Sequence, residues 1–238
     1  MQDREEQILA LLQEQHTLSF RRLSQLLFVS EPTVRRAVSR LESSGLVEHV
    51  YGGVKLAQYK NDVIPVDLRE SANASAKETI ARMAAERIHD GDTIFFDSSS
   101  TVRRICHYIA GKHDLTVFTN NLRVLAELRD TDVRVFCTGG AYFRERDCFL
   151  GAMAERFIES VNADLLFFSC LAVSREGLLT DVSEEEISIR RVMMRHAARK
   201  ILLCDSSKYD TVRALRLGDV SELDEVICDR PLHFPGQP

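Results

Sequence analysis

Four short polar stretches in this chain suit the binding of an anionic or hydroxylated small molecule, and each follows an apolar run. They are Asp97-Ser98-Ser99-Ser100-Thr101, Thr119-Asn120-Asn121, Thr138-Gly139-Gly140 and Asp205-Ser206-Ser207-Lys208. The first runs into a predicted helix, whose first backbone N–H groups favour an anion. The Lys208 ammonium would add positive charge, while Asp97 and Asn120 would bind hydroxyl groups.

The elements that would position these stretches alternate between short apolar strands and helices. Strands are expected at Thr93–Asp97, Leu115–Thr119, Val133–Cys137, Leu165–Cys170, Lys200–Cys204 and Glu225–Cys228. Helices are expected at Val102–Ala110, Leu122–Leu128, Ala152–Ser160 and Glu184–Arg199. This order predicts an α/β fold, a mainly parallel sheet covered on both faces, with its ligand beyond the carboxyl ends of the strands.

Each polar stretch also has a simpler reading. Serine-rich turns often cap helices, Gly-Gly is often only a turn, and a single lysine is often solvated. The functional interpretation rests on four such stretches at the same end of successive strands.

A second motif lies between Ser19 and Val54 and predicts a winged helix-turn-helix. Ser19 is a plausible N-cap for a first helix, and Ser30 can cap a second. Gly45 would end the second helix, and Gly52-Gly53 would close a hairpin of strands Leu46–Val50 and Val54–Ala57. An opening helix at Arg4–Gln15 would complete the core beneath the second helix.

The second helix of this motif has the residue types of a DNA-reading helix. Arginine can bind guanine bidentately or contact phosphates, and residues early in a recognition helix lie nearest the base edges. The expected DNA-binding residues are Ser30, Glu31, Thr33, Arg35, Arg36 and Arg40. The alternative is a small helical subdomain with a solvated charged face, and it stays open because arginine pairs are common on helices.

Composition narrows the class of protein. The 238 residues have a net charge of −5 and contain six cysteines and seven histidines without the spacing of a metal site. We therefore expect buried free thiols, no metal and no cofactor. No apolar run is long enough to span a bilayer and the first residues are too charged for a signal peptide, so a cytoplasmic protein is expected.

The remaining segments suggest domain boundaries. We expect a DNA-binding domain at 1–57, a linker at 58–75 and an α/β effector-binding domain at 76–238. Ser75 and Glu78 have capping-box spacing at the start of a helix that would extend to about His89. Ser183 and Glu186 repeat this spacing before the longest helix.

The stretch VSEPTVRRAVSRLESSGLVEHVYGGV resembles the N-terminal signature of the DeoR family of bacterial transcription regulators. Ala37 and His49 stand where that family usually has Asp and Arg. The second half of the chain resembles the family's effector domain, which is similar to sugar-phosphate isomerases. The matching positions are Asp97 through Thr101, Thr119-Asn120, Gly139-Gly140, Gly151 after the Arg144 loop, and Asp205-x-Ser207-Lys208. Ser99 stands where the family usually has glycine.

The resemblance implies a homo-oligomeric repressor of carbohydrate-metabolism genes that binds double-stranded operator DNA and responds to a phosphorylated sugar or related metabolite. It implies effector contacts from Asp97 through Thr101, Thr119, Asn120, Gly139, Gly140, Arg144 and Lys208. Two alternatives remain. One is an isomerase-like enzyme. The candidate groups for its acid–base chemistry are Asp97, Asp181, Glu184, Glu185, Glu186 and Lys208. The other is a C-terminal module that only mediates dimerisation.

Overall fold

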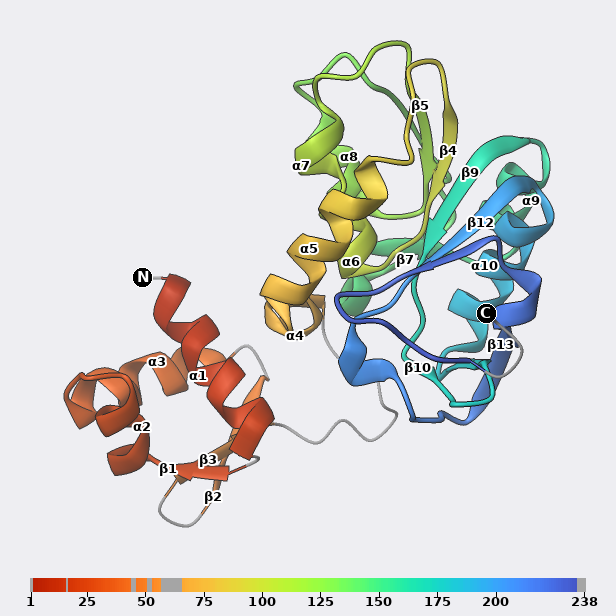
Figure 1. The fold of residues 1–238 in the computed structure, drawn as a ribbon. Helices are drawn as coiled ribbons and strands as arrows, with labels where there is room; N and C mark the ends of the chain where they lie inside the picture. Colours follow the sequence, from red (N-terminus) through yellow and green to blue (C-terminus); the bar gives the residue numbers. More distant parts are fainter. Residues whose placement is uncertain (1, 16, 44–45, 51–52, 57–65, 235–238) are drawn as a thin grey trace. The chain divides into compact units, whose positions relative to one another are not determined.

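The computed structural model describes residues 2–15, 17–43, 46–50, 53–56 and 66–234. The chain divides into two compact units, Met1–Ala74 and Ser75–Pro238. Figure 1 shows the elements of each unit along the chain. The two units are described separately below.

The first unit is a winged helix-turn-helix, as predicted. Its helices are α1 (Gln2–Gln15), α2 (Phe20–Leu26) and α3 (Glu31–Ser43). Strands β1 (Thr17–Ser19), β2 (Val47–Val50) and β3 (Gly53–Leu56) form a sheet in the order β1-β3-β2, in which β1 was not predicted. The helices enclose an apolar core that includes Ile8, Leu12, Leu23, Val34 and Val38.

Local signals explain how this unit is built. The expected cap at Ser19 is confirmed, because its hydroxyl accepts a hydrogen bond from the Arg22 N–H at 3.1 Å. Gly53 is needed for the approach of β1 to β3, since a Cβ there would lie 2.4 Å from the Leu18 carbonyl oxygen. Gly45 and Gly52, the other two glycines of the predicted motif, lie outside the described residues.

The second unit contains the predicted parallel sheet. Its six strands have the order β14-β12-β9-β4-β5-β6, and every neighbouring pair is parallel. The strands are β4 (Thr93–Phe96), β5 (Thr116–Thr119), β6 (Arg134–Cys137), β9 (Ala163–Phe168), β12 (Ala197–Leu203) and β14 (Glu225–Ile227). All six correspond to predicted strands, with ends that differ by up to three residues.

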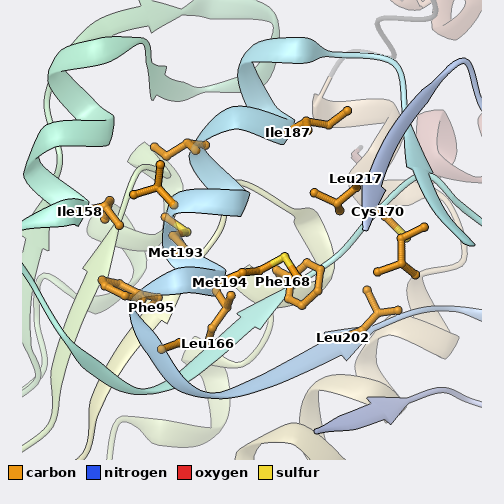
Figure 2. Close-up of a cluster of buried hydrophobic side chains, with 14 of the residues drawn as sticks. Phe95, Ile158, Leu166, Phe168, Cys170, Ile187, Met193, Met194, Leu202 and Leu217 are labelled. Carbon is orange, nitrogen blue, oxygen red and sulfur yellow. The ribbon is translucent and has the colours of Figure 1, made fainter. Parts of the chain in front are cut away.

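Helices cover both faces of this sheet (Figure 1). One core cluster contains side chains of α5 (Ala74–Ala85), α6 (Ser100–Arg103), α7 (Cys106–Ile109) and α8 (Leu122–Leu128). The other contains side chains of α9 (Ala152–Glu159) and α10 (Glu184–Arg195), including Ile158, Ile187 and Met193. Figure 2 shows side chains of this cluster, among them Ile158, Ile187 and Met193 of the helices and Phe95, Leu166 and Phe168 of the sheet.

Several local predictions were wrong. Helix α4 (Val66–Ser71), within the segment 58–75 proposed as a linker, was not predicted. Ser75 is not an N-cap, because α5 already begins at Ala74, and the Ser75 carbonyl accepts a hydrogen bond from the Thr79 hydroxyl. Helix α5 ends at Ala85 rather than near His89, and the helix expected at Val102–Ala110 is split into α6 and α7.

The longest predicted helix, Glu184–Arg199, was also predicted too long. Helix α10 ends at Arg195, because pairing of β12 with β9 begins at Ala197 opposite Ala163. Ser183 does cap this helix, accepting a hydrogen bond from the Glu186 N–H at 3.2 Å. The sequence did not predict the hairpin of β7 (Ala141–Phe143) and β8 (Cys148–Leu150). It also missed the small sheet of β10 (Ala172–Val173), β11 (Leu178–Asp181) and β13 (Leu215–Asp219).

Phe28, in the turn between α2 and α3, has a φ of 53° and a side chain that is 94% exposed. A left-handed conformation is unfavourable for a bulky residue, and this ring gains little from burial. Phe28→Gly should therefore raise the free energy of unfolding of the first unit by about 1 kcal/mol. Urea denaturation would measure it, and a loss of stability would show that the ring makes a stabilising contact.

Candidate functional site

The first polar stretch forms a buried loop at the carboxyl end of β4. Its five residues, Asp97 through Thr101, are each 7% exposed or less. The Ser99 N–H donates to Asp97 Oδ1 at 2.9 Å, and the Ser99 hydroxyl accepts from the Val102 N–H at 3.3 Å. Ser99 is therefore the N-cap of α6, which explains how the loop accommodates a side chain where the family usually has glycine.

The second stretch follows β5, the neighbouring strand. The Thr119 hydroxyl donates to the Phe96 carbonyl at 2.8 Å and so ties the ends of β4 and β5 together. Asn120 is fully buried, and its amide nitrogen donates to the Phe149 carbonyl of β8 at 3.1 Å. The strand order thus brings the first two predicted stretches side by side.

Two buried oxygens at the ends of β4 and β5 have no hydrogen-bond partner within the described part of the chain. They are Asn120 Oδ1 and Thr101 Oγ1, on residues 0% and 1% exposed. Buried polar atoms are nearly always hydrogen-bonded, so two unsatisfied oxygens on adjacent strand ends indicate a place where a ligand or water binds. Both residues belong to the predicted effector set.

The third and fourth stretches also lie at carboxyl ends of strands. Gly139 and Gly140 follow β6 with φ values of 64° and 108°, a conformation that favours glycine. Lys208 follows β12, and its ammonium donates to the Ser169 hydroxyl at 2.9 Å and lies 3.8 Å from Asp205 Oδ2. Because Ser169 follows β9, Lys208 reaches across the ends of two neighbouring strands.

A buried ion network, not predicted from the sequence, lies behind the Asp97 loop. The Arg190 guanidinium of α10 donates to Asp97 Oδ2 at 2.8 Å and to Asp181 Oδ2 at 2.6 Å. It also lies 3.6 Å from Glu186, which accepts a hydrogen bond from the Ser98 hydroxyl at 2.8 Å. Four charged residues that are 3% exposed or less thus join β4, β11 and α10.

Opposite charges control ionisation in this network. Burial by itself would raise the pKa of Asp181, but the charge and hydrogen bonds of Arg190 outweigh it and leave that pKa below its ordinary value. Burial likewise opposes ionisation of Arg190, but Asp181 and Asp97 raise its pKa. Each of these two groups thus stabilises the charged form of the other.

Two further cations near the site were also missed. Lys77 of α5 is only 3% exposed, and its ammonium donates to the Ser100 hydroxyl at 3.1 Å. Arg146, from the short 3₁₀ turn between β7 and β8, is buried and pairs with Glu186. The predicted contact Arg144 is instead exposed. The sequence did not indicate that Arg146, two residues further along the chain, would be the buried arginine.

The six cysteines are free, as expected, and four of them are buried, whereas Cys137 and Cys228 are only partly buried. Burial raises the pKa of the Cys170 thiol to about 11, which makes it a poor nucleophile. Among the described residues no group of three or more His, Cys, Asp or Glu side chains could hold a metal ion. None of the described helices is long and apolar enough to cross a membrane.

In the first unit, helix α3 places the predicted DNA-binding residues on its surface and near its start. The Ser30 and Thr33 hydroxyls are 2.9 Å apart, and Arg35 lies 4.0 Å from both the Phe20 ring centroid and the Glu31 carboxylate. The Arg40 guanidinium donates to Glu5 of α1 at 2.6 Å, which gives this residue a structural role. Arg36 is exposed on the same helix.

His49 of β2 occupies the position where the resembling family usually has arginine. Its ring lies 5.4 Å from the Phe20 ring, and Nδ1 lies 2.7 Å from the Glu42 carboxylate. His49 therefore links the β2–β3 hairpin, which is the wing of the motif, to α2 and α3. Arg21 and Arg22 at the start of α2 are also exposed and were not among the predicted contacts.

Replacing Arg190, the cation of the ion network, should change how the stability of the protein depends on pH. In the native protein, the stability supplied by Asp181 is present above its unfolded pKa and is lost as the pH falls through the lowered folded pKa. Arg190→Met should leave three buried carboxylates without their shared cation and reduce stability at pH 7 by about 3–5 kcal/mol.

The same substitution should raise the folded pKa of Asp181, so the deficit should shrink as the pH falls towards 5. Urea denaturation at several pH values would measure both effects. A deficit that is the same at every pH would contradict this account and indicate lost packing alone.

Comparison with known proteins identifies both units. A model described as the DeoR-like helix-turn-helix domain matches residues 4–60, and one described as the DeoR C terminal sensor domain matches residues 72–230. The HTH-type transcriptional repressor CsqR of Escherichia coli (strain K12) is 30% identical over 95% of this chain and 87% of its own length. The L-fucose operon activator of Haemophilus influenzae is 29% identical over 98% of this chain and 93% of its own.

Among solved structures, eIF2B delta from Chaetomium thermophilum matches with a TM-score of 0.50 and 21% identity. The match covers 67% of this chain and 57% of that one. This likeness shows only the fold of the matched region. The two family models together cover most of the sequence, and the curated relatives match nearly all of it. The chain belongs to the DeoR family of transcriptional regulators, with a helix-turn-helix domain followed by a sensor domain.

Proposed function

We propose that this regulator is a cytoplasmic repressor of carbohydrate-metabolism genes that binds operator DNA as a homo-oligomer. A phosphorylated sugar or a related metabolite, bound at the strand-end site, would control its affinity for the operator. The repressor CsqR and a putative aga operon transcriptional repressor are among its relatives, which supports repression. Another relative, the L-fucose operon activator, is named as an activator instead.

The observation that carries the effector proposal is the pair of unsatisfied buried oxygens, one of which is next in sequence to a hydroxyl that accepts from a buried lysine. Thr101 Oγ1 lies in the first turn of α6, next to Ser100, whose hydroxyl accepts a hydrogen bond from Lys77. An ammonium group with adjacent hydroxyls suits a phosphate, and Asn120 Oδ1 suits a sugar hydroxyl. A ligand that carries both a phosphate and a hydroxyl group would contact Lys77, Thr101 and Asn120 together.

The rest of the predicted set would act around this centre. Asp97, Ser98, Ser99 and Thr119 would hold the loop in shape through the hydrogen bonds described above. Gly139 and Gly140 would let the backbone approach the ligand, and Lys208 would supply a second positive charge. Lys77 joins this proposed set, and an effector contact of the exposed Arg144 stays a prediction.

The geometry supports a binding site more than an isomerase. Such an enzyme needs a carboxylate that can accept a proton, but Asp97 and Asp181 are held by Arg190 and Glu186 by Arg146. The lowered pKa of Asp181 also makes it a weak base. A turnover assay with pentose and hexose phosphates should therefore show no conversion.

For the effector, a thermal-shift screen should find a phosphosugar that raises the melting temperature, whereas its unphosphorylated counterpart should not. Ligand at a hundred times its Kd stabilises by roughly 2.7 kcal/mol. Lys77→Met should weaken this response, with Lys112→Met as a control at a lysine that donates instead to the Ile88 carbonyl. A shift from the unphosphorylated sugar alone would contradict the phosphate assignment.

For the operator, Arg36→Ala should weaken binding by about 1–3 kcal/mol and leave the phosphosugar-induced shift unchanged. Arg129→Ala, which changes an exposed arginine of the second unit, is the matched control. Fluorescence anisotropy with labelled operator DNA would measure the difference. Equal affinities for the two variants would remove Arg36 from the DNA interface.

A further inference from the structure

One acidic residue lies within the basic helix-turn-helix of the first unit. Between Ser19 and Leu41 the sequence contains five arginines and a single carboxylate, that of Glu31. Glu31 is the first residue of α3, and its side chain is 42% exposed. Residues at the start of a recognition helix lie nearest the DNA bases, so this carboxylate is expected inside the interface. Because the DNA phosphates repel a negative charge, Glu31 needs a contact there that outweighs the repulsion.

Two simpler roles for Glu31 concern the protein alone. An acidic side chain in the first turn of a helix interacts favourably with the helix dipole, and a pair with an arginine four residues later also supports a helix. The Glu31–Arg35 contact is such a pair, but its N···O distance is 4.0 Å and both side chains are about half exposed. Exposed ion pairs contribute little to stability. Neither role would affect which DNA sequence the protein binds.

The Arg35 side chain is positioned by an aromatic ring. Its guanidinium carbon lies 4.0 Å from the centroid of the Phe20 ring, which is a cation–π contact. Phe20 is only 5% exposed and also packs against the His49 ring of β2, so it is a fixed support. A guanidinium has five N–H donors, and the Arg35 side chain is still 57% exposed. Arg35 therefore keeps donors for a further partner while its position is restricted.

A C·G base pair is chemically complementary to this arrangement. In the major groove, cytosine presents its N4 amino group as a donor, and the paired guanine presents O6 and N7 as acceptors. A glutamate can accept from cytosine N4, and an arginine can donate to guanine O6 and N7. The Glu31 carboxylate and the Arg35 guanidinium supply this acceptor and this donor side by side, because residues four apart are neighbours on a helix.

We infer that Glu31 and Arg35 together read one C·G base pair in each half-site of the operator. The Glu31 carboxylate accepts a hydrogen bond from cytosine N4, and the Arg35 guanidinium donates to O6 and N7 of the paired guanine. Adenine also offers an amino group to a carboxylate, but only guanine has two adjacent acceptors for a bidentate arginine. This inference rests on the proposed binding of operator DNA through α3.

Arg36 lies on a different side of α3 from this pair. With 3.6 residues per turn, Arg36 is rotated by about 140° from Glu31 around the helix axis, whereas Arg35 is rotated by only about 40°. Arg36 is therefore placed to contact another base pair or a phosphate. The assignment thus separates the two neighbouring arginines, since only Arg35 shares its base pair with Glu31.

Selection of binding sites by the full chain from a randomised double-stranded DNA library tests this assignment. The wild type should enrich sites with one fixed C·G pair per half-site, and Glu31→Ala and Arg35→Ala should both relax the preference at that same pair. In a direct binding measurement, the wild type should favour C·G there by about 5–150-fold over other base pairs. Glu6→Ala, at an exposed glutamate of α1, is the matched control and should enrich the wild-type sites.

The outcomes of this selection separate the inference from the proposal beneath it. If Glu31→Ala, with a melting temperature close to that of the wild type, enriches unchanged sites, Glu31 acts only within the helix and the inference is wrong. Relaxation at two different base pairs would also overturn it, because Glu31 and Arg35 would then not share a pair. A wild type that enriches no sequence would contradict the proposed operator binding itself, and this inference with it.

A base analogue tests the contact atoms with the selected operator. Replacing the guanine of this pair by 7-deazaguanine removes the N7 acceptor and leaves the base pairing intact. The wild type should bind the altered operator more weakly by about fivefold or more, because one of the two hydrogen bonds from Arg35 is lost. Arg35→Ala should bind both operators equally. Equal affinities of the wild type for the two operators would contradict the Arg35 contact.

Discussion

The buried guanidinium of Arg190 is the constraint on which the sensor unit depends. A fully buried positive charge is tolerated only where carboxylates surround it, and here Asp97, Asp181 and Glu186 come from three separate elements. The end of β4, the small antiparallel sheet and the first turns of α10 must therefore meet at one point. Since Asp97 opens the loop proposed to bind the effector, the same contact fixes the shape of the proposed site.

The β7–β8 hairpin connects the proposed effector site to α8 and to the ion network. Asn120 donates to Phe149, and Asp147 of the hairpin holds Arg123 of α8 at 2.7 Å. Buried Arg146 ties the same hairpin to Glu186 and so to the ion network. A ligand that engages Asn120 would thus act on the hairpin and, through Arg123, on α8. Regulation would then follow from differential binding to two arrangements of this region.

Sequence patterns predicted the elements with strong local signals. The Ser19 and Ser183 caps, the six parallel strands and the winged helix-turn-helix are examples, because apolar spacing and capping side chains act within a few residues. Strands β7, β8 and β10 have only two or three residues, too few to show alternation. Lys77, Arg146 and Arg190 were missed because helix and hairpin geometry, not sequence neighbours, directs them to the site. The unpredicted end of α10 reflects pairing with β9, a tertiary effect that overrides helix propensity.

The measurement that tests the central claim most directly is operator affinity with and without a sugar phosphate identified by its thermal shift. If the strand-end site controls DNA binding, saturating phosphosugar should change the operator Kd by about 5–150-fold, corresponding to a typical coupling free energy of 1–3 kcal/mol. The operator should change the affinity for the phosphosugar by the same factor. An operator Kd that is identical with and without a bound phosphosugar would contradict the account, because the site would then bind its ligand without controlling the DNA-binding unit.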